Sequence, residues 1–183
     1  GAAINALARH AGAEVRVVDI GVATDLPALP GLLAHKVRHG TANMVHGPAM
    51  SRTVAQQCLE IGITLAEECA RDGISLVATG DMGIANTTAS SALVALFTGT
   101  PVEQVTGRGT GIDDAMWQHK VNVIQRAIQL HAPNVSDALG WLMTVGGLEI
   151  GGIAGLILGC ARHRLPVLVD GLIATAGALV AAA

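Results

Sequence analysis

The feature that most constrains the fold is the alternation of short apolar runs with longer helix-like segments. Three runs rich in Val, Ile and Leu predict β-strands at 14–19, 74–79 and 166–170. Helical segments separate these runs, and strands joined in this way pair in parallel. The apolar residues of each run are continuous instead of alternating, which is typical of strands that are covered on both faces.

Helical periodicity and capping residues place the other elements. We expect Ser51 to cap a helix that Gly73 ends, and we expect a Gly-rich loop over 98–114. The predicted helices span 2–8, 50–72, 87–97, 115–131, 136–145, 148–162 and 171–183. These elements predict a single α/β domain over 1–183, a parallel Rossmann-like sheet flanked by helices. Because the chain begins and ends in helical sequence, we expect it to be the core of a longer chain cut at both ends.

Composition excludes several classes of protein. The 183 residues are 51% hydrophobic but only 2% aromatic, so the core must be aliphatic, and the 23 glycines indicate close approach between elements. A net charge of −3 offers no basic surface for nucleic acid. The most apolar stretch, 150–160, is too short to cross a membrane. Three cysteines without a CxxC pair argue against disulfides or a structural zinc site and favour the reducing cytoplasm.

A Gly-rich turn with an acidic residue follows the second predicted strand. Its sequence, Gly80–Thr88, is GDMGIANTT. In open α/β sheets ligands bind beyond the carboxyl ends of strands, and the free N–H groups of the next helix attract an anion. Asp81 places a carboxylate at the same edge. The sequence is equally compatible with an ordinary strand–helix turn capped by Asn86 or Thr87.

A second Gly-rich loop, Gly107–Asp114 (GRGTGIDD), combines alternating glycines with an arginine and could hold a phosphate. Its spacing matches neither a Walker A loop nor a Gly-x-Gly-x-x-Gly dinucleotide site. Lys120, one of only two lysines, follows Gly111 by nine residues and could neutralise a phosphate bound in the loop. A flexible surface loop and a solvated lysine are the alternatives.

Three further patterns have simpler explanations. His35 and His39 have helical spacing, but cationic residues lie between them and no third ligand is evident, so we expect no metal site. The stripe of Gly151, Gly155 and Gly159 is expected to let a helix pack tightly against the sheet or another subunit. Cys160 is expected to be a small buried side chain and not a nucleophile.

Four ordered motifs resemble nicotinate-nucleotide–dimethylbenzimidazole phosphoribosyltransferases. They are Gly80–Ser91, Gly107–Asp114, Gly146–Gly159 (GGLEIGGIAGLILG) and Pro166–Ile173 (PVLVDGLI), and Gly40–Met50 fits as well. The resemblance implies a homodimer with a large parallel α/β domain and a small helical domain, the latter largely missing here. It also implies transfer of phosphoribose from nicotinate mononucleotide to 5,6-dimethylbenzimidazole, which yields α-ribazole 5′-phosphate for cobalamin and needs no cofactor.

The resemblance further implies roles for individual residues. Asp81 would be an auxiliary acid or base. The residues that would border the base and the nucleotide are Met82, Gly83, Asn86, Thr87 and Thr88. Those that would bind the phosphate are Gly107, Arg108, Gly109, Thr110, Gly111 and Lys120.

Two positions depart from the family pattern. Asp81 stands where the family usually has Glu, and Ala85 replaces a family glycine. The family's catalytic base is a glutamate in a C-terminal motif beyond position 183, so we expect the 183-residue chain alone to be inactive or severely impaired. The alternatives are a catalytically inactive nucleotide-binding module of the same fold, and a scaffold that dimerises through Gly151, Gly155 and Gly159.

Overall fold

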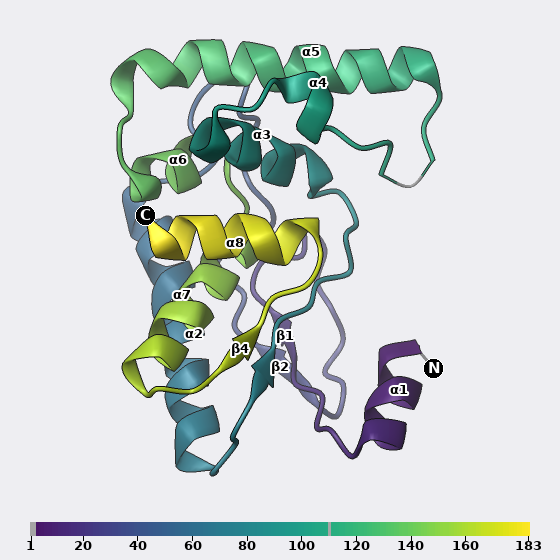
Figure 1. The fold of residues 1–183 in the computed structure, drawn as a ribbon, viewed down its shortest axis with the longest axis vertical. Helices are drawn as coiled ribbons and strands as arrows, with labels where there is room; N and C mark the ends of the chain where they lie inside the picture. The colour runs from purple at the N-terminus through teal and green to yellow at the C-terminus, as the bar shows by residue number, and fades with distance from the viewer. Residues whose placement is uncertain (1–2, 110) are drawn as a thin grey trace.

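Figure 1 shows a computed structural model of the chain, in which residues 3–109 and 111–183 are described. The helices are α1 (Ala3–Ala11), α2 (Arg52–Arg71), α3 (Thr87–Thr98), α4 (Val102–Val105), α5 (Asp114–His131), η1 (Ala132–Asn134), α6 (Ala138–Val145), α7 (Leu148–Arg162) and α8 (Leu172–Ala182). The strands are β1 (Val17–Asp19), β2 (Leu32–Ala34), β3 (Val77–Ala78) and β4 (Val167–Leu168). The predicted α/β class is confirmed, with helices making up most of the structure.

The helix boundaries follow the capping residues closely. Ser51 caps α2 as predicted, since its hydroxyl accepts from Val54 N at 3.3 Å. The start of α6 is corrected from residue 136 because Asp137 is its N-cap, with a carboxylate that accepts from Gly140 N at 2.6 Å. The predicted loop over 98–114 also contains the four-residue helix α4.

The strands are parallel, as predicted, but they form two small sheets in place of one. β1 pairs with β2, and β3 pairs with β4 through Val77↔Val167 and Ala78↔Leu168. The strands are shorter than the apolar runs that predicted them, and β2 was not predicted.

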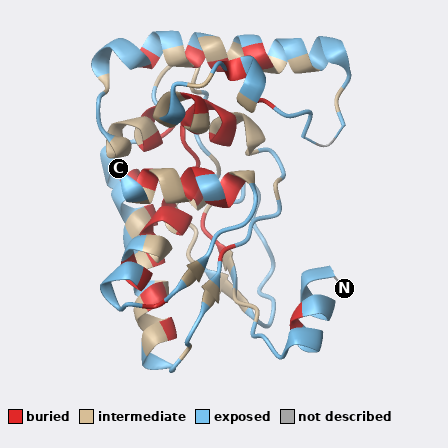
Figure 2. Cartoon of the chain, viewed as in Figure 1, coloured by how far each residue is buried: buried red, intermediate tan, exposed pale blue. Residues whose placement is uncertain are grey.

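The expectation that both faces of the strands are covered was wrong for these residues. Val17 is 50% exposed and Leu168 is 57% exposed, because the helices cover only part of each strand pair (Figure 2).

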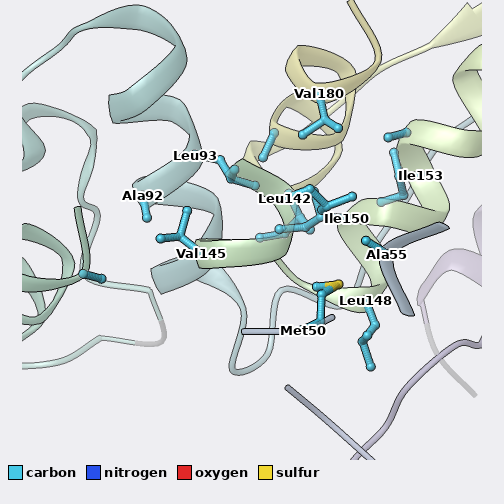
Figure 3. Packing of buried hydrophobic residues seen from close by; sticks show 14 of the residues in the cluster. Met50, Ala55, Ala92, Leu93, Leu142, Val145, Leu148, Ile150, Ile153 and Val180 are labelled. Carbon is cyan, nitrogen blue, oxygen red and sulfur yellow. The ribbon is translucent and has the colours of Figure 1, made fainter. Parts of the chain in front are cut away.

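The core is aliphatic and lies between helices. Buried side chains gather where α3, α6, α7 and α8 meet, and Figure 3 shows Leu93, Leu142, Ile150 and Val180 packed there. Helix α2 packs along α7, so the stripe of small residues on α7 faces a helix and not the sheet or another subunit. Within the described residues, the helices are too short or too polar to span a bilayer.

The element order places several helix starts on one side of the molecule. The chain leaves β3 into the turn before α3, and it leaves β4 into the turn before α8. In Figure 1, α5, α3 and α8 lie one below another in that order, each with its N-terminal end on the right. The N-terminal end of a helix carries partial positive charge and free N–H groups, so this side favours an anionic ligand.

Candidate functional site

The Gly80–Thr88 turn is organised around the Asp81 carboxylate. Asp81 Oδ1 accepts from Gly83 N at 2.6 Å and from Asn86 Nδ2 at 2.7 Å. These contacts are local to the turn, and Asp81 remains exposed to solvent. Met82, beside them, is 83% exposed and available to contact a ligand.

Backbone geometry explains part of the glycine pattern in this turn. Gly83 has φ +68° and Ala85 has φ +63°, so both residues are in the left-handed region. Glycine enters this region at little cost, whereas alanine is strained there. The position of Ala85 therefore requires a glycine-like conformation that its side chain opposes.

Lys120 joins the two Gly-rich segments. From the second turn of α5, its Nζ donates to Thr87 Oγ1 at 2.7 Å and to Gly107 O at 3.2 Å. A Cβ added to Gly109 would lie 3.8 Å from Nζ and 3.4 Å from Thr87 Oγ1. The structure thus brings Lys120 and Thr87 together with the second loop. Burial lowers the pKa of the Lys120 amine, and a partly desolvated ammonium interacts strongly with an anion.

The second loop is held by its own polar contacts. Arg108 Nη1 donates to Ile112 O at 3.0 Å, and Nη2 is paired with the Asp114 carboxylate. Asp113 caps α5 by accepting from Met116 N at 2.8 Å. The Arg108 guanidinium is therefore engaged within its own loop, while Thr110 lies outside the described residues.

Two side-chain contacts fix the loop on the helices behind it. Trp117 Nε1 donates to Thr106 O at 2.8 Å, and Ser91 Oγ donates to Val105 O at 2.9 Å. Ser91 is fully buried in α3, so the segment before Gly107 is tied to the same helix that begins with Thr87. The start of the second loop is therefore attached both to α3, which carries Thr87, and to α5, which carries Lys120.

Neither close packing nor backbone conformation explains why residues 80 and 107 are glycine. A Cβ added to either one would meet no described atom within 4 Å, and neither has a left-handed φ. Glycine at such positions is typical of a backbone that a ligand approaches closely.

One polar residue beside the turn was not predicted. Glu149, the second residue of α7, lies against the Asn86 amide, and its Oε1 is buried without a hydrogen-bond partner in the described residues. Burial raises the pKa of Glu149, and the nearby Asp81 adds to this rise. The available signal was a single acid in the otherwise apolar segment 146–159.

The other patterns do not contribute to this site. The Gly151, Gly155 and Gly159 face is buried against α2, so it is not available for dimerisation. Cys160 is fully buried, as predicted. Among residues 3–109 and 111–183, no three His, Cys, Asp or Glu side chains gather in a possible metal-binding group. His39 is instead paired with Asp25 at 2.7 Å.

Comparisons with known proteins show which family the chain belongs to. A family model named DBI_PRT, described as phosphoribosyltransferase, matches residues 1–183. The chain is 61% identical over 182 residues to the nicotinate-nucleotide–dimethylbenzimidazole phosphoribosyltransferase of Chloroflexus aggregans, and 59% identical over 181 residues to that of Geobacter sulfurreducens. It covers 52% and 51% of these proteins, so it spans about half the length of the curated relatives it matches.

Solved structures show the same fold. The crystal structure of CobT from Thermus thermophilus matches 99% of this chain with a TM-score of 0.93 at 44% identity. A second crystal structure from that organism, of a nicotinate-nucleotide–dimethylbenzimidazole phosphoribosyltransferase, matches with a TM-score of 0.90 at 42% identity. The chain covers 54% and 53% of the two solved chains.

Proposed function

Because the chain belongs to the DBI_PRT phosphoribosyltransferase family, we propose that the complete protein transfers phosphoribose from nicotinate mononucleotide to 5,6-dimethylbenzimidazole. The observation that carries this proposal is the pair of Lys120 contacts, at 2.7 Å to Thr87 and 3.2 Å to Gly107. They unite the start of α3 with the Gly-rich loop in a site suited to a phosphate. The products are α-ribazole 5′-phosphate and nicotinate.

The residues divide into two groups around the bound nucleotide. Lys120 and the backbone of Gly107–Gly111 bind the 5′-phosphate, with Thr87 and Thr88 at the start of α3 beside it. Gly83 and Asn86 border the nucleotide, while the exposed Met82 lines the pocket for the base. Arg108 reaches the phosphate only after its contact with Asp114 opens.

The chemistry needs an anchored phosphate and a carboxylate. A ring nitrogen of the benzimidazole attacks C1′ with inversion, and the C1′–N bond to nicotinate breaks with its electron pair going to the nicotinate nitrogen. The other ring nitrogen loses its proton as the new bond forms or soon after. Asp81 serves as an auxiliary acid or base, and the family's C-terminal glutamate is the main base. We therefore expect residues 1–183 alone to be inactive or severely impaired.

The family resemblance supports three further proposals. We infer that residues 1–183 form a single α/β domain, that the complete protein is a homodimer, and that it acts in the cytoplasm. The continuous apolar cluster that joins α2, α3 and α5–α8 supports the first of these.

Calorimetric titration of nicotinate mononucleotide into this chain tests the site, with free nicotinate as the control. We expect the nucleotide to bind and nicotinate not to, because the phosphate supplies the recognised charge. Turnover of both substrates by the complete protein tests the reaction. Nucleotide binding without turnover in the complete protein would favour an inactive module, and binding of both titrants equally would contradict the phosphate site.

A further inference from the structure

Two successive carbonyl groups at the start of the second loop accept hydrogen bonds from one face of α5. Trp117 Nε1 donates to Thr106 O at 2.8 Å, and Lys120 Nζ donates to Gly107 O at 3.2 Å. Residues three apart in a helix are neighbours on its surface, so α5 presents these two donors side by side. The backbone that enters the loop is therefore held by two side chains of a single helix.

The two contacts set the direction of two peptide planes. A peptide unit is planar, so a side chain that holds its carbonyl oxygen also orients the N–H group of the following residue. Gly107 needs such a restraint, because it has no side chain and a Cβ added there would meet no described atom within 4 Å. Trp117 therefore supplies, through the Thr106–Gly107 peptide, a restraint that neither packing nor a side chain of Gly107 provides.

Both partners of the Trp117 hydrogen bond are themselves held in place. The half-buried indole packs against the aliphatic core cluster. Thr106 is buried, and its own hydroxyl donates to Val102 O at 2.6 Å. A buried indole N–H usually finds some acceptor, and any carbonyl would meet that need. The specific feature here is that the accepting carbonyl directly precedes the one that Lys120 holds.

We propose that Trp117 is a positioning residue of the phosphate site, whose indole N–H fixes the Thr106–Gly107 peptide and so keeps the loop within reach of Lys120. Because Lys120 also donates to Thr87 Oγ1 at 2.7 Å, the restraint extends to the start of α3. The inference rests on the proposed function for the identity of the ligand, the 5′-phosphate of nicotinate mononucleotide. Trp117 acts through the backbone and is not expected to contact the substrates.

Substitution by phenylalanine tests the indole N–H, because it keeps an aromatic ring against the core and removes the donor. In the complete protein, Trp117→Phe should raise the calorimetric Kd for nicotinate mononucleotide about fivefold, the effect of one neutral hydrogen bond. Trp141→Phe is the matched control, since Trp141 is the other tryptophan of the chain and packs against the same cluster from α6. It should leave Kd within about twofold. A Trp117 variant with unchanged Kd would overturn the proposal.

The kinetic constants separate positioning from a general loss of packing. The 5′-phosphate takes no part in the bond changes at C1′, so weaker phosphate binding should raise KM for nicotinate mononucleotide and leave kcat within about twofold. KM for dimethylbenzimidazole should not change, because this base carries no phosphate. A rise in both KM values, or a fall in kcat at unchanged KM, would contradict a role confined to the phosphate site.

A nuclear magnetic resonance measurement follows the indole N–H directly. With isotopically labelled tryptophan in the complete protein, the loss of one indole signal in each Phe variant assigns Trp117 and Trp141. We expect nicotinate mononucleotide to shift the Trp117 signal and not the Trp141 signal; a Trp117 signal that does not move at saturating nucleotide would overturn the proposal. If Trp117→Phe weakens nucleotide binding but the unsubstituted complete protein transfers no phosphoribose, the proposed function fails and the positioning role stands. If transfer occurs and the substitution leaves binding unchanged, the positioning role is wrong.

Discussion

Two regions of this molecule are rich in glycine, and they use it for opposite purposes. In the α2–α7 helix pair, a Cβ added to Gly155 would lie 2.7 Å from the Leu59 carbonyl carbon, and one added to Gly159 would lie 2.6 Å from Ala66 Cβ. In the loop edge, which we define as residues 80–88 and 106–113, Gly80 and Gly107 have no described atom so close. In the helix pair, atoms of the neighbouring helix already occupy the place where a Cβ would lie. At Gly80 and Gly107 in the loop edge, no described atom occupies that place.

The comparison separates stability from binding. Close packing in the helix pair supports the aliphatic core, so substitutions there should act on the free energy of unfolding. The loop edge contributes few buried side chains, so substitutions there should act on ligand affinity. Each of the following changes tests one side of this division.

The largest effect is expected from Gly155→Ala. The added methyl group would displace the Leu59 backbone and should lower the free energy of unfolding by about 3 kcal/mol. The gain in helix propensity, about 1 kcal/mol, opposes the loss without cancelling it. Urea denaturation measures the change, and Gly107→Ala is the matched control, expected within about 0.5 kcal/mol of the unsubstituted chain. Equal effects from the two substitutions would remove the distinction between the regions.

Lys120→Ala is expected to act on binding. Loss of a charge-assisted contact to the phosphate should weaken the binding of nicotinate mononucleotide by about 1.5–3 kcal/mol, or roughly 10- to 150-fold in Kd. Calorimetry measures the change, and Arg126→Ala removes an exposed cation from the same helix as the control. Unchanged affinity in the Lys120 variant would exclude this lysine from the phosphate site.

The two regions also differ in how well the sequence predicted them. Helix positions followed from periodicity and caps, because Ser51 and Gly73 mark the ends of α2 as local rules require. The small-residue stripe was found, but its partner was not, since the choice of α2 over a sheet depends on long-range packing. The lengths of the strands were overestimated for the same reason. An apolar run shows that residues avoid water, but it does not show which of them form hydrogen bonds to a neighbouring strand.

In the loop edge, the sequence predicted which residues are candidates for the site but not which of them contact one another. Gly80–Thr88, Gly107–Asp114 and Lys120 were all predicted as candidate site residues from their chemistry. Lys120 does meet both loops, a contact that spans 33 residues between Thr87 and Lys120 and has no sequence signature. Glu149 was missed because its closeness to Asn86 exists only after α7 packs beside the turn. Local chemistry nominates such residues, and only the tertiary fold shows which of them meet.

Ala85 provides the smallest and most specific test of the comparison. Its φ of +63° is a conformation that favours glycine, but the residue at this position of the turn is alanine. Ala85→Gly should relieve this strain and raise the free energy of unfolding by about 1 kcal/mol, although glycine also gains freedom in the unfolded chain. Ala89→Gly, four residues later within α3, is the matched control and should lower stability by about 1 kcal/mol. Opposite signs for one substitution at two nearby positions would show that backbone conformation governs the loop edge; a loss of stability at both would mean that Ala85 is not strained.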